Sequence, residues 1–277
     1  MWHRLNSAMS RATVSILLHS LLALLWLANA EVYAQRPFVT DDAEVAAKRK
    51  FHFEFANEFD LLPRSSFPNL KQDTADFELD YGLFKDVEIG AESPLIAIFN
   101  AKGLGLRTAF GVGDTNLHLK YKFWKEREGS RLPAMAVGFN VEIPTGDQSQ
   151  RLGSGLTDYA LNVILQKSLT RQTTLRINGG LLFAGDTTTG VIGIVNRGRA
   201  FTGSTSIVRR FTEKLALGAE VAGVASGGPQ FKGKQLQFQL GGHYALREGF
   251  TLNFGVIGGR SPASPRVGAQ LGVAIDF

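Results

Sequence analysis

The stretch of this chain that most limits its possible folds is the last one, residues 266–277, which reads R-V-G-A-Q-L-G-V-A-I-D-F. Side chains alternate between the two faces of a β-strand, so this segment has one uniformly apolar face and one mixed face. The apolar face holds Val267, Ala269, Leu271, Val273, Ile275 and Phe277. Arg266, Gln270 and Asp276 lie on the other face. Such a strand predicts a sheet with one face in apolar surroundings and one in polar surroundings.

The N-terminus predicts export. Arg4 and Arg11 lie in a stretch without acidic residues, and an apolar run follows over residues 14–27. Small residues then offer cleavage after Ala30 or after Ala34, so we interpret residues 1–30 as a signal peptide. A membrane anchor is disfavoured because the run is shorter than the about 20 apolar residues that span a bilayer. The chain has no cysteine, so no disulfide framework is expected.

Alternation of apolar and polar residues recurs along the rest of the chain. Eleven further segments show it: 51–59, 75–81, 87–92, 116–123, 135–143, 158–166, 174–183, 199–211, 215–221, 235–244 and 251–256. With the last segment this predicts about twelve strands, long enough to cross the hydrocarbon when tilted.

The connections between these segments alternate between short and long. We expect short turns near residues 82–85, 169–171, 212–214 and 246–249, and a somewhat longer charged one at 125–131. We expect long links at 61–72, 94–110, 145–154, 185–198, 226–233 and 259–265. Short periplasmic turns alternating with long external loops are typical of outer-membrane barrels, whereas a soluble β-sandwich shares only the alternation within strands.

These features predict an all-β fold, a transmembrane antiparallel up-and-down β-barrel of about 12 strands in the bacterial outer membrane. Closure leaves no unpaired backbone edge, which is why barrels are the sheets that span lipid. The terminal aromatic, Phe277, resembles the signal read by the barrel-assembly machinery. We expect the barrel to cover residues 50–277. Residues 31–49 are expected either to lie in the periplasm or to enter the lumen as a partial plug.

Three stretches carry a family resemblance. They read R-P-F-V-T-D-D at 36–42, G-V-G-D-T-N-L-H-L-K-Y-K-F at 111–123, and F-N-V-E-I-P-T-G-D at 139–147 with G-S-G-L-T-D at 153–158. Together they are similar to the outer-membrane family described as putative MetA-pathway of phenol degradation, over Arg36 to Phe277. The resemblance implies an outer-membrane barrel that passes small, often aromatic or apolar compounds. It supplies no agreed binding residues.

Local chemistry explains part of these motifs. Pro144 cannot donate a ladder hydrogen bond and should end a strand. Gly146 would permit a left-handed turn, and Asp147 could accept hydrogen bonds from loop N–H groups. We expect Asp114, just before the next strand, to shape its loop in the same way.

The polar faces of the strands would enclose the lumen. We predict as pore-lining the residues His52, Glu54, Glu58, Asp76, Glu78, Asp80, Glu88, His118, Lys120, Lys122, Glu142, Arg176, Glu220, His243 and Arg266. Because the last strand closes against the first, an acidic wall would face a more basic one, giving a field that selects solutes by charge. The alternative is that these charges pair across the lumen and plug it.

The function predicted is passive diffusion of small molecules, without cofactor, metal or catalysis. A non-conducting structural or adhesive barrel is one alternative, and an outer-membrane lipid hydrolase is a second. A hydrolase would need a nucleophile beside a histidine at the lipid face or rim, whereas all three mature histidines are expected to face the lumen. The partners expected are outer-membrane lipid, the assembly machinery and a small solute. The mild net charge of +5 without basic clusters does not suggest nucleic acid.

Overall fold

The computed structural model describes residues 36–62, 70–99, 108–150, 152–187, 196–226, 234–261 and 264–277. The predicted signal peptide and both predicted cleavage sites lie outside these ranges. Within them, no helix is long and apolar enough to cross a membrane.

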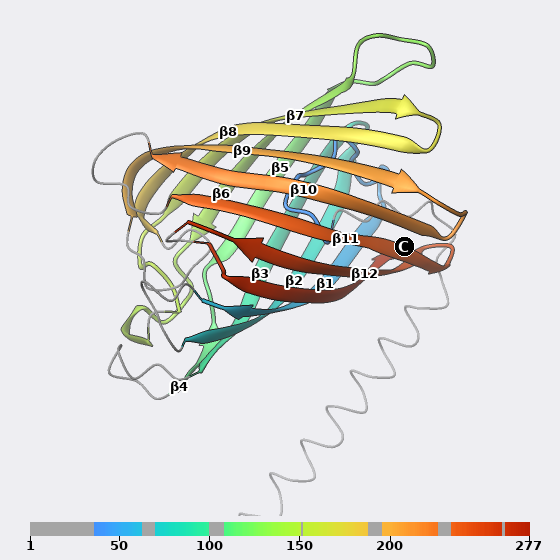
Figure 1. Ribbon diagram of the computed structural model, residues 1–277. Coiled ribbons are helices and arrows are strands. Elements are labelled where there is room, and N and C mark those ends of the chain that lie inside the picture. Colours follow the sequence, from blue (N-terminus) through green and yellow to red (C-terminus); the bar gives the residue numbers. More distant parts are fainter. Residues whose placement is uncertain are drawn as a thin grey trace, which may run out of the picture.

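Thirteen strands account for most of the described residues (Figure 1). They are β1 (Phe51–Leu61), β2 (Lys71–Phe84), β3 (Val87–Phe99), β4 (Thr108–Val112), β5 (Thr115–Trp124), β6 (Ala134–Ile143), β7 (Asp158–Thr170), β8 (Thr173–Thr187), β9 (Asn196–Arg210), β10 (Leu215–Ser226), β11 (Gln235–Arg247), β12 (Phe250–Gly259) and β13 (Val267–Asp276). One 3-10 turn, η2 (Gln148–Gln150), lies in the β6–β7 connection.

Antiparallel pairing closes the sheet into a barrel. Each strand pairs with the next along the chain except β4, which pairs only with β3, and β1 also pairs with β13. The short β4 and the longer β5 pair with successive halves of β3, so together they occupy one position in the ring. The result is a closed barrel of twelve antiparallel positions, which confirms the fold predicted from the sequence.

The link expected at residues 94–110 is shorter than predicted. Pro94 lies inside β3, opposite Asp76 of β2, and β3 continues to Phe99. On its other side Pro94 faces the break between β4 and β5, where its carbonyl accepts a hydrogen bond from N–H of Gly113 (2.8 Å). Proline is tolerated within a sheet where no neighbour needs its missing N–H. The break between β4 and β5 supplies that position, so the strand runs through the proline.

Burial is reversed relative to a water-soluble protein. Glu54 and Asp80 are each 1% exposed, whereas Phe110 is 63% and Leu240 is 60% exposed. Large apolar side chains are exposed all around the outside of the barrel, on strands from β1 to β13. Exposed apolar patches of this extent are rare on soluble monomers. A barrel with charged side chains inside and apolar side chains outside is therefore stable in lipid.

Candidate functional site

Residues 36–50, which precede β1, are called the inner segment below. Residues 36–46 run inside the barrel, and the exposed residues 47–50 join them to β1. At the short-turn end, N–H of Arg49 donates to the carbonyl of Gly82 (2.7 Å), and N–H of Gly82 donates to the carbonyl of Lys50 (3.0 Å). A side chain at Gly82 would overlap the carbonyl oxygens of Ala46 and Ala47. The glycine in β2 therefore lets the inner segment pass against the barrel wall.

Arg36 is held by carboxylates from three adjacent strands. Its guanidinium contacts Glu92 of β3 and lies 3.4 Å from Asp76 and 4.0 Å from Glu78, both on β2. Its Nε is 3.8 Å from Glu54 of β1. Burial alone would lower the pKa of Arg36, but these carboxylates outweigh burial and raise it, so the side chain stays charged.

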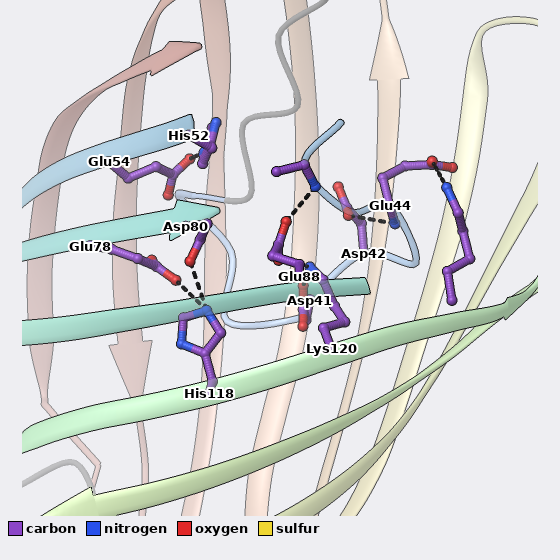
Figure 2. Close-up of polar contacts among 12 residues, drawn as sticks. Asp41, Asp42, Glu44, His52, Glu54, Glu78, Asp80, Glu88, His118 and Lys120 are labelled. Atoms are coloured by element: carbon purple, nitrogen blue, oxygen red, sulfur yellow. Dashed lines mark hydrogen bonds and ion pairs between the residues drawn. The ribbon is translucent and has the colours of Figure 1, made fainter. Parts of the chain in front are cut away.

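The acids of the inner segment contact inward-pointing bases. Asp41 is 3.2 Å from Nζ of Lys120, which also lies 3.3 Å from Glu88. Glu44 is 2.7 Å from Nζ of Lys122. Figure 2 shows Asp41, Glu88 and Lys120 gathered where the inner segment passes β3 and β5. Asp42 reaches the opposite side of the barrel, 3.1 Å from Arg176 of β8. The inner segment is thus linked to both sides of the lumen by ion pairs.

A second set of contacts holds Pro37, Phe38, Val39 and Thr40. Glu220 of β10 accepts hydrogen bonds from the N–H groups of Val39 (3.1 Å) and Thr40 (2.6 Å). Phe38 is buried against Val208 and Ala216. A Cβ on Gly218 would approach the Phe38 ring to 2.9 Å, so the glycine makes room for the aromatic side chain. The amide nitrogen of Gln239 donates to the carbonyl of Pro37.

The lumen has two unlike walls. We call the inward faces of β1, β2, β3 and β5 the charged wall, since they carry ten of the predicted pore-lining residues. These are His52, Glu54, Glu58, Asp76, Glu78, Asp80, Glu88, His118, Lys120 and Lys122, all buried or half-buried. We call the inward faces of β7–β10 the small-residue wall. Its members include Ala160, Asn162, Ile164, Asn178, Leu182, Ala200, Ser204, Ser206, Ala216 and Ala222.

The expected basic wall opposite the acids is wrong. Lys120 and Lys122 lie on β5, beside the acids, and contact Glu88 and the inner segment. Arg266 lies half-buried in the β12–β13 connection, at the end of the barrel. On the small-residue wall, Arg176 contacts Asp42 of the inner segment. The cation that faces the acids of β1, β2 and β3 is instead Arg36, which belongs to the inner segment.

The three predicted histidines do not converge among the described residues. His52 lies 2.6 Å from Asp276 through Nδ1 and 3.3 Å from Glu54 through Nε2. His118 lies 2.7 Å from Asp80. His243, on β11, is half-buried, and its Nδ1 has no hydrogen-bond partner in the described part of the chain. Each histidine points inward, as the alternation predicts.

Toward the long-loop end, a cavity of about 390 Å³ lies above the inner segment. Val39 forms part of its lining and is 63% exposed. The acids in its lining are Glu58 of β1, Glu142 of β6 and Asp158 of β7. Among the described residues that line it there is no lysine or arginine. We call this cavity the vestibule.

The family motifs meet at the rim of the vestibule. Asp114 accepts hydrogen bonds from N–H of Gly146 (2.9 Å) and N–H of Ser154 (2.7 Å), which joins two connections far apart in sequence. β6 ends at Ile143, directly before Pro144, as predicted. Asp147 accepts from N–H of Ser149 at 2.9 Å, also as predicted.

The left-handed turn predicted at Gly146 is wrong. Gly146 is not among the described glycines with positive φ. Close packing requires the glycine instead, because a Cβ there would lie 2.7 Å from the Leu152 carbonyl oxygen and 2.9 Å from Cα of Gly153.

Phe277 lies where the barrel closes. Its ring stacks on that of Phe51, with centroids 5.5 Å apart, and the two residues exchange backbone hydrogen bonds. The predicted role of Phe277 as an assembly signal stays a prediction.

Sequence reasoning missed the residues of the inner segment that organise the lumen, namely Arg36, Asp41, Asp42 and Glu44. The first three lie in the R-P-F-V-T-D-D stretch, which marked the family resemblance but has no strand-like alternation that would have placed it in the barrel.

Comparisons with known proteins agree with this fold. The sequence profile of the family described as putative MetA-pathway of phenol degradation matches residues 74–277. Among solved structures, the COG4313 outer-membrane channel from Pseudomonas putida F1 is similar, with a TM-score of 0.66 and 13% identity over 89% of this chain and 100% of that one. The NanC porin has a TM-score of 0.54 and 8% identity, over 82% and 98% of the two chains. The KdgM porin, solved with disordered oligogalacturonate, has a TM-score of 0.51 and 11% identity, over 82% and 99%. No curated protein matches this chain.

Proposed function

This chain belongs to the family described as putative MetA-pathway of phenol degradation, and from that premise we propose that it is an outer-membrane channel for passive diffusion of small molecules. A membrane barrel with a polar lumen is the architecture that such diffusion requires. The lipid of the outer membrane would contact its apolar outer faces, and the assembly machinery would insert it.

The observation that carries the proposal is the vestibule above the inner segment. Its volume of about 390 Å³ falls within the range of small-molecule sites. Its mixed lining of Leu182 and Val224 beside Glu58, Glu142 and Asp158 would admit compact solutes with an apolar body. The acids would exclude anions, because like charges are repelled where the walls are of low dielectric. Neutral and cationic small molecules, aromatic ones among them, are therefore the expected solutes.

Conductance and solute flux test this proposal together. We expect purified protein in planar bilayers to give channel events with cations favoured over anions. In vesicles that swell on uptake, we expect uncharged phenolics to enter faster than the corresponding carboxylates. Glu142→Gln should reduce the cation preference, whereas Glu128→Gln, an exposed position in the β5–β6 connection, should leave it unchanged. Absence of both channel events and swelling would refute the proposal.

A second candidate, a non-conducting barrel, is favoured by one observation. The inner segment is tied to β2, β3, β5, β8 and β10 across the lumen, through Arg36, Asp41, Asp42, Glu44 and the N–H groups bonded to Glu220. If the inner segment keeps the barrel closed, the full chain would give no channel events, whereas deletion of the inner segment would open the lumen and give them. We do not propose the lipid hydrolase, because His52, His118 and His243 all point into the lumen and away from lipid.

A further inference from the structure

Glu78, Asp80 and His118 place three potential metal ligands at one point of the charged wall. One ligand atom from each residue lies within 4.8 Å of the others. Nε2 of His118 is 2.7 Å from Oδ1 of Asp80 and 3.9 Å from Oε1 of Glu78. Figure 2 shows both carboxylates directed at the same ring nitrogen. A ring nitrogen has one hydrogen to donate at most, so it cannot bond to both oxygens as a donor.

The register between β2, β3 and β5 brings the side chains of Asp80 and His118 together. Asp80 of β2 lies opposite Gly90 of β3, and Gly90 lies opposite His118 of β5. Two side chains from strands that do not touch can therefore meet above the glycine between them. A Cβ at Gly90 would overlap Oδ1 of Asp80 and Nε2 of His118. The missing side chain at position 90 leaves the space in which these ligands face each other.

The carboxylates have coordination capacity to spare. Asp80 is 1% exposed, yet its Oδ2 has no hydrogen-bond partner among the described residues. A buried carboxylate oxygen without a partner is costly, and an ion would satisfy it. Glu78 turns Oε2 toward Arg36, at 4.0 Å, and leaves Oε1 for His118. The closest contacts of the nearby cations are with other carboxylates, since Arg36 is closest to Glu92, and Lys120 contacts Asp41 and Glu88.

We propose that Glu78, Asp80 and His118 form a binding site for one divalent transition-metal ion in the lumen. The class of ion follows from the ligands. Imidazole favours Zn²⁺ and its neighbours over Mg²⁺ and Ca²⁺, and two carboxylates with a neutral imidazole balance the charge of a divalent ion. Because Glu78 and His118 also border a cavity of about 380 Å³, the ion would have an open position toward the lumen. The site does not depend on whether the barrel conducts.

Zn²⁺ itself tests the proposal, by calorimetric titration of the purified, untagged protein in detergent. We expect one Zn²⁺ per chain, with much weaker binding of Mg²⁺. X-ray absorption of the Zn²⁺-loaded protein should show one imidazole and oxygen ligands at about 2.0–2.2 Å. His118→Asn should abolish this binding. His243→Asn, at another inward histidine that belongs to no such cluster in the described ranges, should retain it.

Gly90→Ala separates the geometry from the ligands, because it keeps all three ligands and closes the space between them. We expect it to weaken Zn²⁺ binding by about 10–100-fold, the size of effect seen when ligand orientation is disturbed. Resistance of the folded barrel to unfolding in SDS at room temperature verifies that each variant is folded. No binding to the wild-type chain would overturn the proposal. Equal Zn²⁺ affinity in the wild type, His118→Asn and Gly90→Ala would also overturn it.

Discussion

The charged wall and the small-residue wall contact the same inner segment through different interactions, chiefly ion pairs on the first and apolar packing on the second. On the charged wall, Arg36 enters a group of four carboxylates and Lys120 reaches Asp41. On the small-residue wall, Phe38 packs on Val208 and Ala216, and Gly218 leaves room for its ring. One wall supplies charge and the other supplies space. The difference suggests that the first wall fixes the inner segment by ion pairs and the second by shape.

The energetic cost of the charges in the lumen depends on the inner segment as well as on the strands that carry them. The charged wall alone would bury several uncompensated carboxylates, which is unfavourable in a low-dielectric interior. Lys120 compensates Glu88 within the wall, but Arg36, which contacts four other carboxylates, is supplied only when the inner segment is in place. The stability of this part of the barrel and the closure of the lumen are therefore expected to be coupled.

The largest expected effect on the position of the inner segment comes from removing the charge of Arg36. Arg36→Met leaves four carboxylates without their shared partner, and removing one member of a buried ion pair costs about 3–5 kcal/mol. Because the chain has no cysteine, Thr40→Cys provides a single reporter at a fully buried position. We expect maleimide labelling of Cys at position 40 to accelerate by more than about 100-fold in the Arg36→Met background, at about 1.4 kcal/mol per factor of ten.

Arg171→Met is the matched control for this experiment. Arg171 also has an ion pair, with Glu128 at 3.9 Å, but its side chain is 95% exposed. Exposed pairs contribute little, so labelling should not change. Equal labelling rates in wild type and Arg36→Met would show that the ion pairs do not hold the inner segment.

The next effect concerns the outer faces, where the two walls should be alike. Leu119 of β5 and Val163 of β7 both point outward near the middle of their strands. A lysine near the bilayer midplane costs about 2–4 kcal/mol, so Leu119→Lys and Val163→Lys should lower the free energy of unfolding by similar amounts. Urea unfolding in lipid vesicles measures this, with exposed Glu128→Lys as the control. A cost at only one of the two positions would mean that lipid does not surround the barrel evenly.

A smaller effect is expected from altering shape alone. Phe38→Leu keeps an apolar side chain of similar size, and such replacements usually cost less than about 1.5 kcal/mol. Labelling of Cys at position 40 should therefore accelerate by less than about tenfold. Phe110→Leu, on the outward face of β4, should not change the rate. An effect of Phe38→Leu as large as that of Arg36→Met would remove the distinction drawn between the walls.

The smallest effect lies at the rim, away from both walls. Hydrogen bonds from Ser149 and Gln150 lower the pKa of Asp147 below its ordinary value of 3.8. Because the folded-state pKa is depressed, the ordering of this connection is present above pH 3.8 and lost as the pH falls through the folded value. NMR titration of the Asp147 carboxyl carbon should give a value below 3.8, and Ser149→Ala should raise it. A value at or above 3.8 in the wild type would contradict these hydrogen bonds.

The sequence predicted the barrel because strand alternation is a local property. Each inward Glu and outward Phe or Leu could be assigned from its neighbours alone, and the loop rhythm gave the order of the strands. Pro94 was misplaced because its tolerance in β3 depends on a break in the neighbouring strand, which is not local. The inner segment was left open between two locations because Arg36 acquires its role only when Glu54, Asp76, Glu78 and Glu92 are brought together from three strands.

The central claim is that apolar faces meet lipid while charged faces enclose a lumen occupied by residues 36–46. Nitroxide labels placed one at a time from Leu117 to Phe123 of β5, in protein reconstituted in vesicles, test it most directly. We predict that relaxation by lipid-soluble oxygen is high at 117, 119, 121 and 123, and low at 118, 120 and 122. Oxygen accessibility without this alternation, or with its maxima at the even positions, would contradict the account.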